Sequence, residues 1–145
     1  MSCVLRASGT NFEVGEFLKT SSLDALTVFH RGEVQSRGSV MTQRRTEQSG
    51  VNVSVSTREF SDLRGQIEDA VEFLSENEEE LRRLRDFPGL ERMDLDFPVE
   101  DRDVVFQSDG FPPRLLSLLG ALRIGLVVSR HPAYWEVEGQ ISTQQ

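Results

Sequence analysis

The sequence predicts an α+β fold with a single mixed or mostly antiparallel sheet and helices packed on one face. Residues 51–56 alternate valine with asparagine or serine, the pattern of a strand with one buried face and one wet face. After that strand, apolar side chains recur at helical spacing and form a single stripe: Leu63, Ile67, Ala70, Val71 and Leu74. A half-buried strand followed by an amphipathic helix is typical of such layered folds.

Composition favours one globular domain over residues 1–132, with a C-terminal tail from 133 to 145. The chain has 145 residues, of which 37% are hydrophobic and 28% charged. The longest apolar stretch, 115–128, is interrupted by Arg123 and Gly125, so it is too short to span a membrane. The first residues lack the pattern of a signal peptide. A single cysteine, Cys3, fits a reducing compartment, and we therefore expect a cytoplasmic protein.

The first half of the chain predicts two strands, a short helix and a long loop. Residues 3–8 alternate as a strand, and Asn11 is placed to cap a short helix that contains Phe17. Residues 25–30 are rich in β-forming side chains and predict a second strand. The polar stretch that follows, 31–50, is predicted to be a mobile loop before the strand at 51–56.

Two helices are expected after that strand. The first extends to residue 74 with Asp62 or Ser61 as its N-cap. Ser75 and Glu78 match a capping box, which predicts a second helix over 76–85, although the first helix could instead continue without a break. The Phe-Pro-Gly run at 87–89 ends the helical region.

The last third predicts strands at 92–99 and 104–107, a helix that begins at Pro112-Pro113, and a final strand at 124–129. The nearly unbroken apolar run at 124–129 favours a strand buried on both faces. Residues 133–145 are expected to add an edge strand or to remain loose. The predicted order is therefore β-α-β-β-α-α-β-β-α-β.

This order and several short words resemble a bacterial family known only as domain of unknown function 4279. The words are Ser8-Gly9, Arg31-Gly32-Glu33, the run 53–56, Gly110-Phe111 leading to Pro113, Leu116 and Leu119, and the closing segment 126–132. The chain lacks the Leu-Gly and Pro-Thr word that we expect after the first helix, and the Trp expected in the third strand. The resemblance covers about residues 2–132 and implies a fold but no activity, cofactor or site residue.

Charge is the strongest functional signal. The net charge is −8, and residues 59–103 contain sixteen acidic and six basic side chains, a local balance of −10. Such a surface repels nucleic acid and attracts a basic protein partner, although acidity also simply keeps proteins soluble. Candidate contacts are Glu78, Glu79 and Glu80. Four-residue spacing also pairs Glu78 with Arg82 and Glu79 with Arg83 on an exposed helix.

The loop at 31–45 forms the basic patch of the sequence through Arg31, Arg37, Arg44 and Arg45. One interpretation is a clamp for a carboxylate or phosphate, which would make the protein a small-ligand binder or an enzyme. The other is a solvated loop without a ligand. No phosphate-binding glycine motif is present.

No catalytic residue, cofactor site or metal site follows from the remaining chemistry. His30 and His131 are interpreted as turn residues at strand ends, and Cys3 as a small apolar side chain of the first strand. The densest group of carboxylates lies at 94–103: Asp94, Asp96, Glu100, Asp101 and Asp103. These side chains either face solvent on a half-exposed strand, or Asp94 and Asp96 hold a hard cation between them. We therefore expect a non-enzymatic interaction domain. One concrete form is an immunity-type protein that masks a basic toxin.

Overall fold

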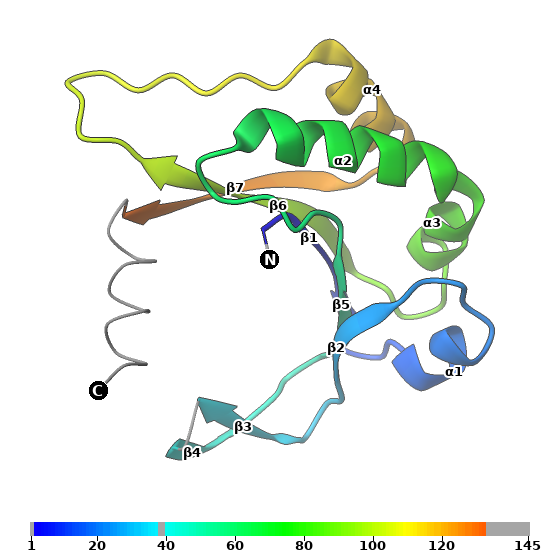
Figure 1. The fold of residues 1–145 in the computed structure, drawn as a ribbon. Coiled ribbons are helices and arrows are strands. Elements are labelled where there is room, and N and C mark those ends of the chain that lie inside the picture. The colour runs from blue at the N-terminus through cyan, green and yellow to red at the C-terminus, as the bar shows by residue number, and fades with distance from the viewer. Residues whose placement is uncertain (1, 38–39, 133–145) are drawn as a thin grey trace.

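A computed structural model describes residues 2–37 and 40–132 (Figure 1). Its main feature is a five-stranded sheet with the spatial order β2-β5-β1-β6-β7. Neighbouring strands are antiparallel except β6 and β7, which are parallel. The strands are β1 (Val4–Gly9), β2 (Ala25–Phe29), β5 (Ser49–Ser54), β6 (Arg92–Asp101) and β7 (Gly125–Pro132). The predicted α+β class with one mixed sheet is confirmed.

Four helices cover one face of this sheet (Figure 1). They are α1 (Val14–Lys19), α2 (Leu63–Glu76), α3 (Glu78–Arg85) and α4 (Pro113–Leu122). Each helix contributes side chains to one hydrophobic core. Helix α4 connects β6 to β7, which satisfies the need of a parallel strand pair for a crossover connection.

The core lies on one side of the sheet because alternate strand residues point to opposite faces. On the central strand β1, Leu5 and Ala7 are buried against the helices, whereas Arg6 lies exposed on the other face. Val51 and Val53 of β5 repeat this pattern and are buried. The valine alternation that predicted a half-buried strand is therefore confirmed, although β5 begins and ends two residues earlier than expected.

The loop predicted at 31–50 is wrong, because half of that segment forms the two strands of a β-hairpin. Strands β3 (Val34–Arg37) and β4 (Val40–Arg45) pair antiparallel in a small separate sheet. Figure 1 shows the hairpin projecting from the end of the main sheet that is distant from α2 and α4. At its base, the backbone N–H of Gly32 donates to the Thr46 carbonyl at 2.9 Å, and Thr46 donates to Glu33 at 2.9 Å. Short polar sequences can thus pair with each other without the apolar alternation that sequence patterns detect.

The strand predicted at 104–107 is also wrong. Residues 102–112 contain no strand or helix, and Val104, Val105 and Phe106 are exposed. The Gln107 side chain closes the connection instead, because its amide donates to the Glu100 carbonyl and accepts from the Arg102 N–H. An apolar run predicts a strand only where a neighbouring strand is available to pair with it.

The last strand differs from expectation in its burial. β7 is the edge strand of the sheet, and its helix-side residues Leu126 and Val128 are 37% and 44% exposed. The helices do not fully cover this edge, so the expected burial on both faces is wrong. The predicted tail, residues 133–145, lies outside the described residues.

Helix ends follow the sequence signals in part. Asp62 caps α2, since its carboxylate accepts the Gly65 N–H at 2.9 Å. The other two predicted caps are wrong: α1 begins at Val14 after Glu13, not after Asn11, and Asn77, not Ser75, separates α2 from α3. The Asn77 side chain donates to the Phe73 carbonyl at 2.9 Å and so closes the end of α2.

Asp62→Ala should lower the free energy of unfolding by about 1 kcal/mol, because the N–H of Gly65 loses its acceptor. Urea denaturation measures this change. Asp62→Asn, which keeps an acceptor oxygen, should recover most of the loss, and Ser61→Ala should change stability by less than about 0.5 kcal/mol. Equal effects of Asp62→Ala and Ser61→Ala would contradict the assignment of the cap.

Candidate functional site

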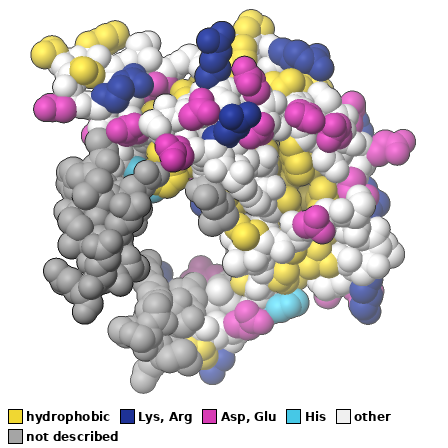
Figure 2. Space-filling model, viewed as in Figure 1, with side chains coloured by type: hydrophobic (Ala, Val, Ile, Leu, Met, Phe, Trp, Pro, Cys, Tyr) yellow, Lys and Arg dark blue, Asp and Glu magenta, His cyan; other side chains and the backbone are white. Residues whose placement is uncertain are grey.

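The outer side of α2 presents three glutamates at four-residue spacing, which we call the acidic ridge: Glu68, Glu72 and Glu76. All three side chains are exposed, and none makes an ion pair with a described residue. Like charges one helical turn apart repel each other and destabilise a helix. Acidic side chains are spread over the helical side of the molecule in Figure 2.

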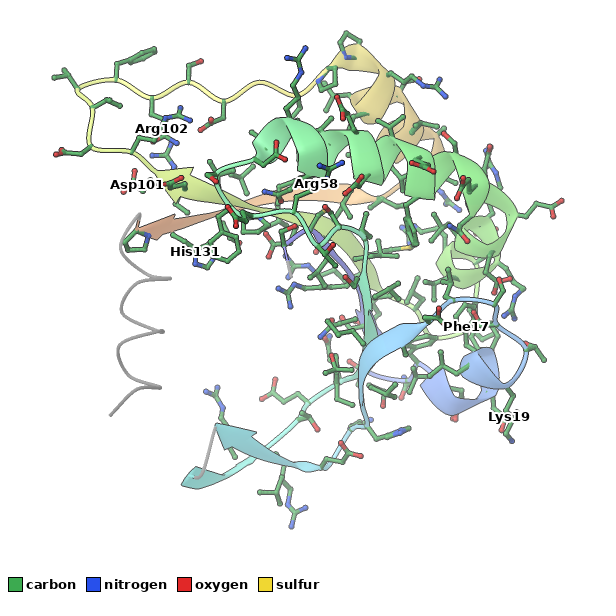
Figure 3. All side chains as sticks on the ribbon, in the orientation of Figure 1. Phe17, Lys19, Arg58, Asp101, Arg102 and His131 are labelled. Atoms are coloured by element: carbon green, nitrogen blue, oxygen red, sulfur yellow. The ribbon has the colours of Figure 1, made fainter. Side chains whose placement is uncertain are left out.

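Two other acids on or beside α2, Asp62 and Asp69, pair with an arginine of the protein. Arg58, beside the first turns of α2 in Figure 3, lies 3.3 Å from Asp69 and 3.8 Å from Asp62. Asp69 also accepts a hydrogen bond of 2.7 Å from the Ser56 hydroxyl. Among the acids of α2, Asp69 is thus compensated by Arg58, whereas the three glutamates of the acidic ridge are not.

The predicted contacts Glu78, Glu79 and Glu80 begin α3 but differ in availability. Glu78 pairs with Arg82 at 2.8 Å, as its four-residue spacing predicted. The predicted pair of Glu79 with Arg83 is wrong, because Arg83 pairs with Glu80 at 2.7 Å. Glu79 is therefore the exposed member of this trio that makes no ion pair with a described residue.

Arg83, which pairs with Glu80 on α3, also contacts α1. Its guanidinium lies 4.3 Å from the ring centroid of Phe17, and its Nη2 donates to the Phe17 carbonyl at 3.3 Å. Phe17 in turn packs edge-on against Phe87 with ring centroids 5.3 Å apart. Glu80 thus orients a residue of the core interface, and changing it would disturb the fold as well as the surface charge.

The four arginines of the predicted patch lie at and around the hairpin. Arg45 donates to the Gly32 carbonyl at 2.7 Å and so stabilises the base of the hairpin, while Arg44 is exposed on β4. Arg37 lies at the end of β3, and its side chain is outside the described part of the chain. The backbone N–H of Arg31 donates to the Ser49 hydroxyl at 2.8 Å. A clamp built from these residues stays a prediction.

Arg31 does line a cavity of about 360 Å³ between α1 and the start of β5, together with His30, Ser49 and residues 10–16. His30 is exposed at the end of β2, as expected for a residue beside a turn. Arg31 and Glu16 face the same space with opposite charge. Of the four arginines of the predicted ligand site, Arg31 is the one that lines this cavity.

A second cavity, of about 350 Å³, lies on the sheet face that the helices leave open. Arg6, at the centre of the sheet, donates to Asp96 at 3.3 Å, and the Ser129 hydroxyl donates to the other oxygen of Asp96 at 2.7 Å. Arg92 pairs with Asp94 on the same face. Each arginine in this cavity is therefore matched by a carboxylate.

The predicted alternative of a cation between Asp94 and Asp96 loses its support, because both carboxylates already accept from arginines. The rest of the acidic group lies farther along: Glu100 and Asp101 end β6, and Asp103 follows in the connection. Figure 3 shows Asp101 and Arg102 at that end of the sheet. Among the described residues, no three His, Cys, Asp or Glu side chains gather as a metal ion would require.

His131 and Cys3 occupy structural positions. His131 lies within β7, paired with Glu100 of β6, so its predicted place in a turn is wrong; its ring stacks on Phe60 with centroids 4.8 Å apart (Figure 3). Cys3 is fully buried, which confirms its predicted packing role. Burial, followed by the negative charges of Asp96 and Asp69, raises the pKa of the Cys3 thiol well above its ordinary value of 9.0. The thiol is therefore protonated and unreactive in the folded protein.

Sequence reasoning missed an apolar groove of about 650 Å³, which we call the helix groove. Its walls are Leu63, Arg64, Ile67 and Glu68 of α2 and Gly110, Phe111 and Pro112 before α4. Ile67 is predicted to face the core, and Phe111 is notable only within the Gly110-Phe111 word, so their types gave no sign that they line one groove. Only the packing of two distant segments creates it.

The comparisons with known proteins add no relative. No protein-family model matches the chain, and neither curated proteins nor solved structures gave a similar protein. The resemblance to domain of unknown function 4279 therefore stays a prediction. Among the described helices, none is long and apolar enough to cross a membrane.

The buried thiol makes stability depend on pH. Because folding raises the pKa of Cys3 above its unfolded value of 9.0, its contribution to stability is complete below pH 9 and is lost as the pH rises further. Wild type should lose up to about 1.4 kcal/mol per pH unit above pH 9 relative to Cys3→Ala, measured by urea unfolding. Parallel pH profiles for the two proteins, or rapid thiol labelling of the native state, would contradict this assignment.

Glu72→Lys should raise the free energy of unfolding by about 1 kcal/mol, because it replaces two repulsive four-residue pairs on α2 with attractive ones. Urea denaturation at low salt measures the gain, and 1 M NaCl should reduce it. Glu72→Gln should give about half the effect. A loss of stability in Glu72→Lys would instead mean that Glu72 has a stabilising partner in the folded protein.

Proposed function

We propose that this protein is a non-enzymatic interaction domain of the cytoplasm that binds a basic protein partner through α2 and the start of α3. The observation that carries the proposal is the acidic ridge. Its three carboxylates repel one another and have no ion pair among the described residues, whereas the nearby acids Asp62, Asp69, Glu78 and Glu80 are paired with arginines. Binding a cationic surface would relieve this repulsion.

The charge of the ridge favours a protein partner over nucleic acid, because phosphates are repelled by an acidic surface. The exposed Glu79 of α3 extends the same negative region beyond Asn77. One specific form of this function is an immunity-type protein whose acidic helices mask a basic toxin or nuclease. Electrostatic steering would make such capture fast and sensitive to salt.

The ridge can be tested without disturbing the fold. The triple variant Glu68→Lys, Glu72→Lys, Glu76→Lys should lose affinity for the partner by about tenfold or more, since three rim charges become repulsive. The partner is first captured from a lysate of the native host at low salt and identified by mass spectrometry. Affinity is then measured by titration calorimetry with both purified proteins.

A matched control changes the same amount of charge elsewhere. Asp24, Glu33 and Glu47 are exposed on other parts of the described chain and make no ion pair with a described residue. Their triple replacement by lysine should weaken binding far less than the ridge variant does. Glu80 is left unchanged, because it orients Arg83. The proposal fails if no basic protein binds in defined stoichiometry, or if both variants weaken binding equally.

A second candidate function is binding of a small anionic ligand, favoured by the arginines that line two cavities. Arg31 lines the cavity beside α1, and Arg6 has guanidinium donors beyond the one that contacts Asp96 on the open sheet face. We rank this function lower because Asp94 and Asp96 neutralise the arginines of the open face and Glu16 shares the cavity of Arg31.

A further inference from the structure

We propose that the helix groove receives an apolar anchor side chain of the basic partner, which therefore binds through an amphipathic basic segment. This inference rests on the proposed function and specifies the chemistry of the partner. It joins two independent features of the surface, an apolar groove and an uncompensated row of charge. The first supplies affinity and the second supplies orientation.

The shape and lining of the groove fit an apolar side chain. Its volume of about 650 Å³ falls in the range of sites that enclose a ligand group, and Leu63, Ile67, Phe111 and Pro112 provide an apolar surface. The polar groups among its lining side chains are Arg64 and Glu68, both exposed on α2. A leucine, methionine or phenylalanine would lose its hydration there and leave its polar backbone near the rim.

The groove and the acidic ridge are continuous, because Glu68 belongs to both. Glu72 and Glu76 follow one and two helical turns farther along α2, at about 6 Å and 12 Å by the rise of an α-helix. A partner helix that lies along α2 would match this spacing with an apolar anchor and basic residues four and eight positions away. Charge complementarity thus selects a basic segment, and the groove selects one with an apolar anchor.

Apolar burial also explains how a specific complex would survive at physiological salt. Exposed ion pairs contribute little to affinity and are weakened by salt. Interfaces obtain most of their affinity from a few anchors buried in pockets and surrounded by a polar rim. The helix groove and its charged border have this arrangement.

Two synthetic helical peptides serve as probes. One has a leucine followed by lysines four and eight positions later, and the other has serine in place of that leucine with the same charge. Fluorescence anisotropy should show that the leucine peptide binds wild type about tenfold to hundredfold more tightly, as expected from burial of one apolar side chain. This difference should persist at 0.3 M NaCl.

Filling the groove provides the decisive variant. A Cβ at Gly110 meets no atom within 4 Å, so Gly110→Phe adds a ring at the groove without displacing the backbone. This variant should remove the advantage of the leucine peptide and leave the serine peptide unaffected. Gly120 on α4 has equally open surroundings and does not line the groove, so Gly120→Phe is the matched control and should preserve both affinities.

The outcomes separate the two proposals. Equal binding of both peptides, lost in the ridge triple variant, would overturn the groove inference and leave the proposed function intact. Failure of both peptides to bind would count against both. Self-association of wild type in sedimentation, abolished by Gly110→Phe, would show that a second copy occupies the groove, for example through its exposed Val105 and Phe106, and would overturn the partner that we infer.

Discussion

Burial of the central sheet on one side only is the constraint from which the rest of the structure follows. Leu5 and Ala7 of β1 can be covered only if helices gather on their face, and all four helices do so. The connections that carry them must therefore start and end on that side. The opposite face stays in contact with solvent and can therefore carry charged side chains, which pair there as Arg6 with Asp96 and Arg92 with Asp94.

This division gives the two sides of the molecule different electrostatic characters. Charges on the open face are matched between the neighbouring strands β1 and β6, as Arg6 with Asp96, and along β6 itself, as Arg92 with Asp94. On the helical side, α2 can match its charges only with residues one turn away or with Arg58 at its flank. At that spacing Glu72 has only Glu68 and Glu76, and Arg64, four residues before Glu68, makes no ion pair with it. The proposed interaction surface on the outside of α2 therefore coincides with glutamates whose charge no ion pair of the described chain compensates.

The sequence predicted those parts of the fold that depend on local periodicity. The valines of β5 and the stripe from Leu63 to Leu74 identified the buried face and the helix that covers it. It failed where tertiary context decides: the hairpin at 34–45 pairs with itself despite its polarity, and 104–107 has no strand to pair with. The candidate site followed the same rule. The charge of the sequence revealed the acidic region. It could not show which glutamates form ion pairs, or that a groove forms between α2 and Phe111, because both depend on the packing of the folded chain.

The position of β1 at the centre of the sheet has a consequence for protein synthesis. Among the strands of the main sheet β1 is made first, but its partners are distant in sequence: Val4 pairs with Ser54 on one side and with Asp96 on the other. One edge of β1 must therefore wait for β5, and the other edge must wait longer, for β6. Unpaired edges with apolar side chains invite association with other chains. In the nascent chain, the edge of β1 that pairs with β6 is therefore exposed for longer than the edge that pairs with β5.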